Sequence, residues 1–584
     1  MPFRAGCGTG ERIRAQEMSA VPADQWRAKA QVARQAGDVA GALAILEQGV
    51  AALPADAALA NSAGHAAMGM KDFEKAAHQF ASAVQLAPDV LEFTINYAIA
   101  LTSMERYRDA AAALEPFARE GQNVARYCSV RATAERGLHN LAEAAHWYDR
   151  CIDLEPGHPR ALHGRARLAL ERGEPSAASR YEQALAVTNG DPELWLGRAQ
   201  ALDAAGEVNA ARDIAEQLFE QAPHWLEGLQ FLAQLRLAAG EADFASHYET
   251  AMGRAPQDPA IPAELCAVLA GRDRNKDAAA IAQRARTRFP NDQQFALLEA
   301  VYASASGEVE RAETLWNSLL VESREDRLHL ARHRLRRSEF DRAEILLDSV
   351  LEEDPMSVSA WALRSVLWRL TGDQREEWLH HQQGLVAFLQ LHDADKILPS
   401  AIAKLHQIHD ASAQPLGQSL RGGTQSRALL FDRTEPEFSA LRGAILSTIE
   451  EHRAAMPHRD PTHPILRHRD TPWEIAGSWS VRLTGGGDKH ASHIHPLGMI
   501  SSALYCECPQ AESAAADADP RAGWLELGRP PEDLGIGLEP IAAFPPRAGY
   551  LALFPSTLYH GTRPFPDGRR MTVAFDVTPV REAV

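Results

Sequence analysis

The chain has 584 residues, which is too long for a single hydrophobic core, and its hydrophobic content of 45% is ordinary for a globular protein. Two or more domains are therefore expected. The formal net charge of -18 argues against a nucleic acid partner, because binding to phosphates requires a basic surface. No run of about 18 apolar residues and no secretory signal is visible, so we expect no membrane partner. Six cysteines are too few for a disulfide framework in so long a chain, so we predict a cytoplasmic location.

Residues 22–390 are predicted to form an array of helical repeats. This range is rich in Ala, Leu, Glu, Gln and Arg, which favour helices. Prolines recur in it at intervals of about 34 residues or twice that. They are Pro54, Pro88, Pro156, Pro223, Pro256, Pro290 and Pro355. A period of this length is typical of a unit of two helices, and such units stack into a solenoid because one alone cannot bury its apolar face.

Small and aromatic residues occupy matching positions in these units. Two units carry them at the same offsets before the proline: Ala76, Phe80 and Ala83 in one, and Ala144, Tyr148 and Cys151 in the other. On these residues the range resembles the tetratricopeptide repeat family. The resemblance implies an α-solenoid that binds a protein or peptide partner. The alternative is a scaffold or dimerisation arm without a peptide ligand.

The repeat phase is lost between residues 391 and 428, where glycine and proline mark a junction. The stretch Gln418–Gln425 is not of low complexity, as a simple linker would be. We therefore predict an ordered segment that packs against the next domain and lines its pocket. Residues 436–452 follow with the apolar periodicity of an amphipathic helix.

Residues 429–584 are predicted to form the second domain. Short alternating segments with Gly and Pro turns indicate an all-β sandwich or barrel. Side chains alternate along a strand, so His493 and His495 point the same way and can form half of a metal site. A jelly roll can bring the distant His560 to the same mouth. We expect these three histidines to bind a non-haem iron ion, because imidazole suits iron and iron oxygenases leave coordination positions open.

Arg570 is the predicted anchor for an acidic co-substrate. A 2-oxoglutarate molecule binds iron through its keto acid end, and its far carboxylate requires a cation. The guanidinium group can pair with that carboxylate through two hydrogen bonds. Thr572, on the same strand face, and Tyr505 are predicted to add further donors.

Residues 415–584 resemble the 2-oxoglutarate- and iron(II)-dependent oxygenases that are often fused to tetratricopeptide repeats. The motifs that carry this resemblance are Gln418–Gln425, Trp479, His493-x-His495-Pro496, Ser501, Tyr505, Phe554-Pro-Ser556, His560 and Arg570-x-Thr572. The resemblance implies a double-stranded β-helix, or jelly roll, that couples decarboxylation of 2-oxoglutarate to oxidation of a second substrate. In the wider superfamily an Asp stands where this chain has His495. A carboxylate elsewhere, such as Asp488, is an alternative ligand.

Three hypotheses for function follow. The first is an Fe(II)- and 2-oxoglutarate-dependent dioxygenase that hydroxylates a protein or peptide recruited by the solenoid. The second is a protein-binding repeat scaffold with a catalytically inactive β domain, which the departure at His495 keeps open. The third is a cupin-like metal enzyme of three histidines that uses no 2-oxoglutarate.

Overall fold

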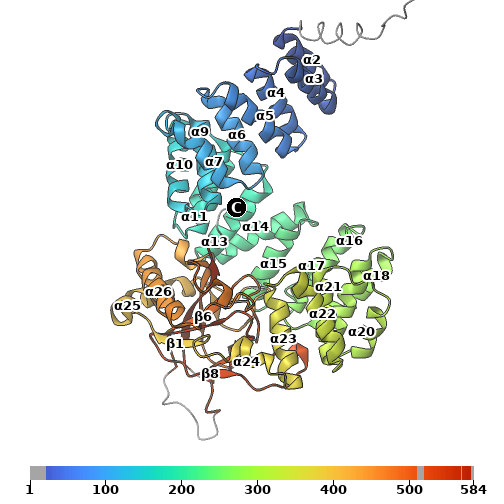
Figure 1. The fold of residues 1–584 in the computed structure, drawn as a ribbon, viewed down its shortest axis with the longest axis vertical. Helices are drawn as coiled ribbons and strands as arrows, with labels where there is room; N and C mark the ends of the chain where they lie inside the picture. Colours follow the sequence, from blue (N-terminus) through green and yellow to red (C-terminus); the bar gives the residue numbers. More distant parts are fainter. Residues whose placement is uncertain (1–20, 510–518, 567, 581–584) are drawn as a thin grey trace, which may run out of the picture. The chain divides into compact units, whose positions relative to one another are not determined.

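The computed structural model describes residues 21–509, 519–566 and 568–580 (Figure 1). The chain divides into two compact units, Met1–Leu194 and Trp195–Val584, and the helix α13 (Pro192–Ala204) contains the boundary between them. Among the described residues, no helix is both long and apolar enough to span a membrane.

The first unit consists of helices that pair in antiparallel fashion along the chain. They are α2 (Ala23–Gln35), α3 (Val39–Ala52), α4 (Ala57–Gly69), α5 (Phe73–Leu86), α6 (Leu91–Ser103), α7 (Tyr107–Leu114), η1 (Glu115–Phe117), α8 (Ala118–Gly121), α9 (Ala125–Gly137), α10 (Leu141–Leu154), α11 (Pro159–Glu171) and α12 (Ala177–Val187). Aspartates cap the N-termini of several helices. The side chains of Asp56 and Asp72, for example, accept hydrogen bonds from backbone amides of the first turn. The aromatic position of the repeat fills the space over a glycine of a neighbouring helix. A Cβ at Gly64 would lie 2.6 Å from the ring of Phe80, so the two helices approach closely there.

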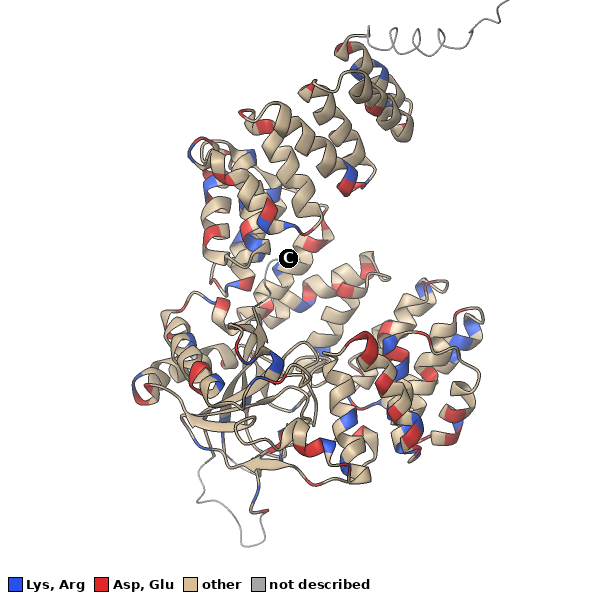
Figure 2. Ribbon diagram, in the orientation of Figure 1, with Lys and Arg blue, Asp and Glu red and all other residues tan. Residues whose placement is uncertain are grey.

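The second unit begins with further helix pairs of the same kind. They are α14 (Val208–Gln221), α15 (Leu226–Ala238), α16 (His247–Arg254), α17 (Ala260–Ala270), α18 (Asn275–Arg288), α19 (Gln293–Ala305), α20 (Val309–Trp316), α21 (Arg324–Arg336), α22 (Phe340–Glu353), α23 (Val358–Thr371) and α24 (Arg375–His380). Figure 2 shows acidic and basic residues scattered over the helices of both units. Several ion pairs join residues 34 or 35 positions apart, which places them on equivalent helices of successive repeats: Arg126–Glu92, Arg136–Glu171, Arg254–Glu220 and Arg284–Glu249.

The rest of the second unit is built on antiparallel sheets. Its elements are β1 (Ala387–Gln390), α25 (Ala394–Asp410), β2 (Leu420–Arg421), β3 (Thr424–Gln425), η2 (Leu430–Asp432), α26 (Pro436–Ala455), η3 (Leu466–His468), β4 (Trp473–Leu483), β5 (Lys489–His490), β6 (Ile500–Glu507), β7 (Leu525–Leu527), η5 (Glu532–Leu534), β8 (Ala542–Phe544), β9 (Tyr550–Pro555), β10 (His560–Thr562) and β11 (Arg570–Pro579). A six-stranded sheet has the order β1-β9-β6-β11-β4-β3, and smaller sheets are formed by β10-β7-β8 and by β2-β5. The predicted fold class, a helical repeat solenoid followed by a jelly roll, is confirmed.

The two faces of the six-stranded sheet have different roles. On one face Leu504, Val573 and Phe575 are fully buried in a core cluster with residues of α25 and α26. These helices therefore cover that face, as the apolar pattern of residues 436–452 predicted for α26. The opposite face carries Thr572 of β11, which lies across from Tyr505 of β6. The alternation of side chains along β11 thus separates the packing residues from the polar ones.

The predicted domain boundaries are not tested directly, but some strands lie outside the range predicted for the β domain. β1 lies in the range predicted for the repeats, yet it pairs with β9 at the edge of the large sheet. Its Phe388 stacks on Phe544 with the ring centroids 5.0 Å apart, so burial of an aromatic side chain favours this pairing. α25 lies in the predicted junction, where loss of the repeat period left no sign of a helix of this length.

Candidate metal centre

Three histidine side chains meet at the mouth of the β domain. His493 and His560 face each other in an isolated antiparallel bridge, with N–H···O distances of 3.0 and 2.9 Å between their backbones. This bridge places the two rings 4.3 Å apart, and His495 lies two residues beyond His493 on the same side. One ligand nitrogen from each of the three side chains lies within 4.8 Å of the others. The sequence-predicted triad is thus brought together.

Each ring is held by a hydrogen bond at Nδ1. The Nδ1 atoms of His493 and His560 donate to the backbone oxygens of Ala491 and Leu558, at 2.8 and 3.1 Å. A carbonyl oxygen only accepts, so these bonds fix the tautomer and leave the Nε2 lone pairs free. The Nε2 atoms of His493 and His495 are 3.1 Å apart. A proton on one nitrogen, or a cation bound by both, satisfies this pair.

The third ring is held by a carboxylate. Asp576 on β11 accepts a hydrogen bond from Nδ1 of His495 at 2.6 Å, and Ser501 donates to the same oxygen at 3.1 Å. Ser501 in turn lies 2.9 Å from the hydroxyl of Ser556. The ring of Trp479 packs edge-on against His495. Contacts of this kind fix the tautomer and the orientation of a ligating imidazole.

Sequence reasoning did not single out Asp576. It lies on the same face of β11 as Arg570 and Thr572. The alternation of side chains along this strand could therefore have indicated that Asp576 faces the pocket. The structure corrects the alternative in which Asp488 supplies the carboxylate. Asp488 instead accepts from the backbone amide and hydroxyl of Thr484, at 2.9 and 3.1 Å, and so closes the glycine-rich turn after β4.

The surroundings keep two of the imidazoles uncharged. Loss of water around His493, together with the nearby His495, lowers its pKa to about 3. Burial, followed by His493 and His495, lowers the pKa of His560 well below its usual value. Neutral imidazole is the form that binds metal, so these rings are in the ligating state at neutral pH. A set of three nitrogen donors suits iron, zinc or copper.

Arg570 is a buried cation at the start of β11. Only 3% of its surface is exposed, and one terminal nitrogen donates to the backbone oxygen of Gly523 at 2.9 Å. Its guanidinium lies 4.9 Å from the ring centroid of Tyr505. Its Nε has no hydrogen-bond partner, and it makes no ion pair with any carboxylate of the described ranges. Since Thr572 lies across from Tyr505, the structure brings the three predicted co-substrate residues together.

His490 connects the arginine with the triad. Its ring stacks on that of His493 with the centroids 5.8 Å apart. Burial, His493 and Arg570 lower the pKa of His490, in that order of size. Its Nδ1 lies 3.2 Å from the hydroxyl of Ser419. β2 pairs with β5, so the stretch Gln418–Gln425 lies beside this histidine.

Comparison with known families agrees with this architecture. Residues 477–576 match the family model described as "Putative 2OG-Fe(II) oxygenase", and residues 175–235 match a tetratricopeptide repeat model. The chain contains tetratricopeptide repeats and a 2OG-Fe(II) oxygenase-family domain. The oxygenase-family domain includes His493, His495, His560, Arg570 and Asp576, and its family implies Fe(II) and 2-oxoglutarate as partners.

Two curated proteins match parts of the chain. Protein FlbA of Caulobacter vibrioides is 28% identical over 201 residues, which cover 34% of each chain. The Hsp70-Hsp90 organizing protein of Triticum aestivum is 32% identical over 141 residues, which cover 23% of this chain and 24% of that protein. The chain therefore spans at most about a third of these relatives.

Solved tetratricopeptide repeat structures match part of the chain. One is a tetratricopeptide repeat protein from Parabacteroides merdae, with 18% identity and a TM-score of 0.34. The match covers 42% of this chain and 97% of that one.

Proposed function

We propose that the protein is an Fe(II)- and 2-oxoglutarate-dependent dioxygenase that hydroxylates a protein or peptide. The observation that carries this proposal is the convergence of three imidazole nitrogens within 4.8 Å, on the domain that also buries Arg570. His493, His495 and His560 hold the iron. When bound, the iron supplies the oxidising chemistry; the protein supplies ligands and a shielded pocket.

Arg570 binds the far carboxylate of 2-oxoglutarate. A buried guanidinium without a carboxylate partner is costly, and an anion that enters the pocket removes that cost. The pKa of Tyr505 is raised by burial, although Arg570 opposes this shift, so the phenol stays protonated and donates to the co-substrate. Thr572 adds a hydroxyl on the same face of the sheet.

Asp576 compensates for the missing carboxylate ligand. Three neutral imidazoles leave the full charge of the metal ion in place, whereas the hydrogen bond from His495 to Asp576 brings a negative charge one step away. Asp576→Asn is expected to weaken Mn²⁺ binding by about 10- to 100-fold, the usual effect of losing such a partner. Isothermal titration calorimetry with Mn²⁺ measures this. Glu474→Gln, an exposed carboxylate on β4, serves as the control and is expected to bind normally.

The test of the proposed function is the turnover of 2-oxoglutarate. Purified full-length protein is incubated with Fe(II), 2-oxoglutarate and O₂, and succinate is measured with and without Fe(II). We expect slow, iron-dependent succinate formation even without the second substrate. Protein that binds iron but forms no succinate, alone or with a cell extract as substrate source, contradicts the proposal.

A second candidate is a three-histidine metal enzyme that does not use 2-oxoglutarate. It is favoured by the ligand set, since no carboxylate of the described residues joins the three histidines within ligand distance. Both candidates require the same metal site and differ at Arg570. The binding of a protein partner by the repeats and the cytoplasmic location remain proposals, which the repeat match and the cysteine content support.

A further inference from the structure

The residues next to the histidines point away from the metal centre. Ile494 lies between His493 and His495, and Tyr559 precedes His560, so alternation in extended chain turns both outward. Both join one hydrophobic cluster with residues of α21 to α24, such as Leu335. Tyr559 is only 4% exposed in this cluster. The late repeat helices therefore pack behind both segments that carry the triad.

Polar contacts fix Tyr559 in this position. Arg332 of α21 donates to the Tyr559 hydroxyl at 3.1 Å and to a carboxylate oxygen of Asp533 at 2.8 Å. Arg336, one turn later, donates to the backbone oxygen of Asp533 at 2.9 Å. The backbone oxygen of Tyr559 accepts from the amide of Gly528 at 2.6 Å. The residue before His560 is thus held through both its side chain and its backbone.

A second buried contact lies three residues before His560. His380 of α24 lies 2.8 Å from the hydroxyl of Thr557, which is 3% exposed. The other ring nitrogen lies 3.0 Å from a carboxylate oxygen of Glu376. Because the carboxylate accepts from Nδ1, Nε2 is left to accept from Thr557. α24 thus holds the same segment at a second point.

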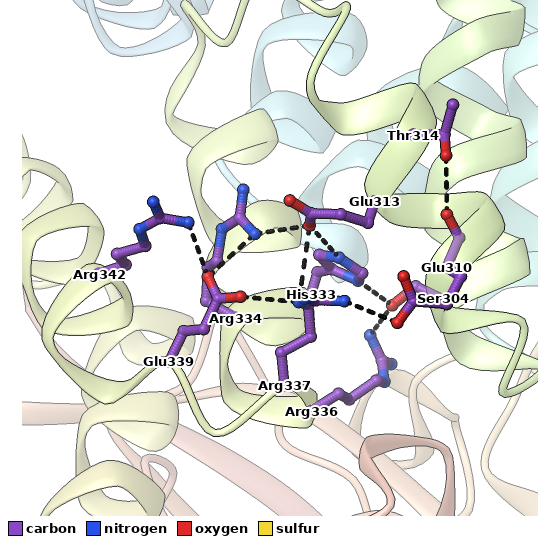
Figure 3. Close-up of polar contacts among 10 residues, drawn as sticks. All are labelled: Ser304, Glu310, Glu313, Thr314, His333, Arg334, Arg336, Arg337, Glu339 and Arg342. Atoms are coloured by element: carbon purple, nitrogen blue, oxygen red, sulfur yellow. Dashed lines mark hydrogen bonds and ion pairs between the residues drawn. The ribbon is translucent and has the colours of Figure 1, made fainter.

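α21 is itself fixed to the preceding repeat. Figure 3 shows its residues in a network with α19, α20 and the start of α22. His333 and Arg334 contact Glu313, at 3.0 and 2.6 Å. Arg336 donates to the hydroxyl of Ser304 at 2.8 Å as well as to Asp533. This arginine links the repeat network directly to the oxygenase-family domain.

We propose that α21 to α24 form the outer wall of the metal centre, with Arg332 and His380 as positioning residues for His560. Arg332 acts through Tyr559, and His380 acts through Thr557. The proposal rests on the metal site proposed above. These repeats then have a role in the site itself, in addition to any role in binding a partner.

The test measures the site with and without metal in full-length Arg332→Gln and Tyr559→Phe. Without metal, hydrogen–deuterium exchange is expected to rise in peptides that contain residues 493–496 and 557–560. With Mn²⁺, the dissociation constant is expected to rise roughly three- to tenfold, less than for a direct partner of a ligand. In the double variant the two effects are expected to be less than additive, because both changes remove the contact between Arg332 and Tyr559 and only Arg332→Gln also removes the ion pair with Asp533. Arg324→Gln is the matched control, since that arginine of α21 pairs with Asp354 at the exposed start of the helix.

The outcomes distinguish a failure of the positioning role of α21 to α24 from a failure of the proposed function. Unchanged hydrogen exchange and unchanged Mn²⁺ affinity in both variants contradict the positioning role of α21 to α24. If the wild-type protein binds no Mn²⁺, the proposed metal site is wrong. The exchange measurement without metal still tests whether α21 to α24 position the segments that carry the triad. If Arg332→Gln does not fold, Tyr559→Phe, which keeps the ring in the cluster, decides alone.

Discussion

Replacing His493 with alanine is expected to abolish metal binding and leave the fold intact. The bridge between His493 and His560 consists of backbone hydrogen bonds, so it survives the loss of the side chain. The imidazole is only partly buried, so its truncation leaves no large closed cavity. Its removal therefore costs little stability when no metal is bound. The affinity for Mn²⁺ is expected to fall more than about 100-fold, beyond the effect of losing a mere partner of a ligand.

Thermal unfolding with and without Mn²⁺ measures both expectations. At a Mn²⁺ concentration of 100 times its dissociation constant, the wild type gains about 2.7 kcal/mol of stability from binding. The same concentration is expected to stabilise the variant by less than about 0.4 kcal/mol. His458→Ala, an exposed histidine outside the site, should keep the full metal effect. A variant that is still stabilised by Mn²⁺ would remove His493 from the ligand set.

The repeats and the triad were predictable because their signals are periodic or local. The spacing of prolines such as Pro88 and Pro156 follows from the geometry of one helix pair, which every unit repeats. The pattern His493-x-His495 follows from alternation along extended chain. The approach of His560 required the fold class as well, because only closure of a jelly roll brings a distant histidine to the same mouth.

Contacts that depend on tertiary packing left no such signal. Arg332 lies 227 residues from Tyr559 in the sequence. Its helix contains several arginines, and the sequence does not distinguish Arg332 from the others. Asp576 becomes a partner of His495 only because the turn after His495 leads into β6, which pairs with β11 and places Ser501 across from Asp576. Four residues of β1 are too few for periodicity to separate a strand from a helix end. Composition and spacing describe the elements, whereas these contacts arise from how the elements meet.

Replacing Arg570 with glutamine is expected to remove 2-oxoglutarate binding and preserve metal binding. The loss of one partner of a buried charge pair costs about 2–5 kcal/mol, which corresponds to at least about a 30-fold loss of affinity. Titration of 2-oxoglutarate into Mn²⁺-loaded protein measures this, and a parallel Mn²⁺ titration shows whether the triad is intact.

Arg569→Gln is the matched control for this variant. Arg569 is the neighbouring residue, but its side chain is 52% exposed and forms a long ion pair with Glu507, at 4.0 Å. The same change of charge one position away should therefore leave the co-substrate affinity unchanged. If Arg570→Gln binds 2-oxoglutarate as the wild type does, Arg570 is not the anchor for this co-substrate, and the second candidate is favoured. If the affinity falls only in Arg570→Gln, the guanidinium holds a carboxylate of 2-oxoglutarate, and a metal enzyme that uses no 2-oxoglutarate has no explanation for a buried cation that pairs with no carboxylate of the described residues.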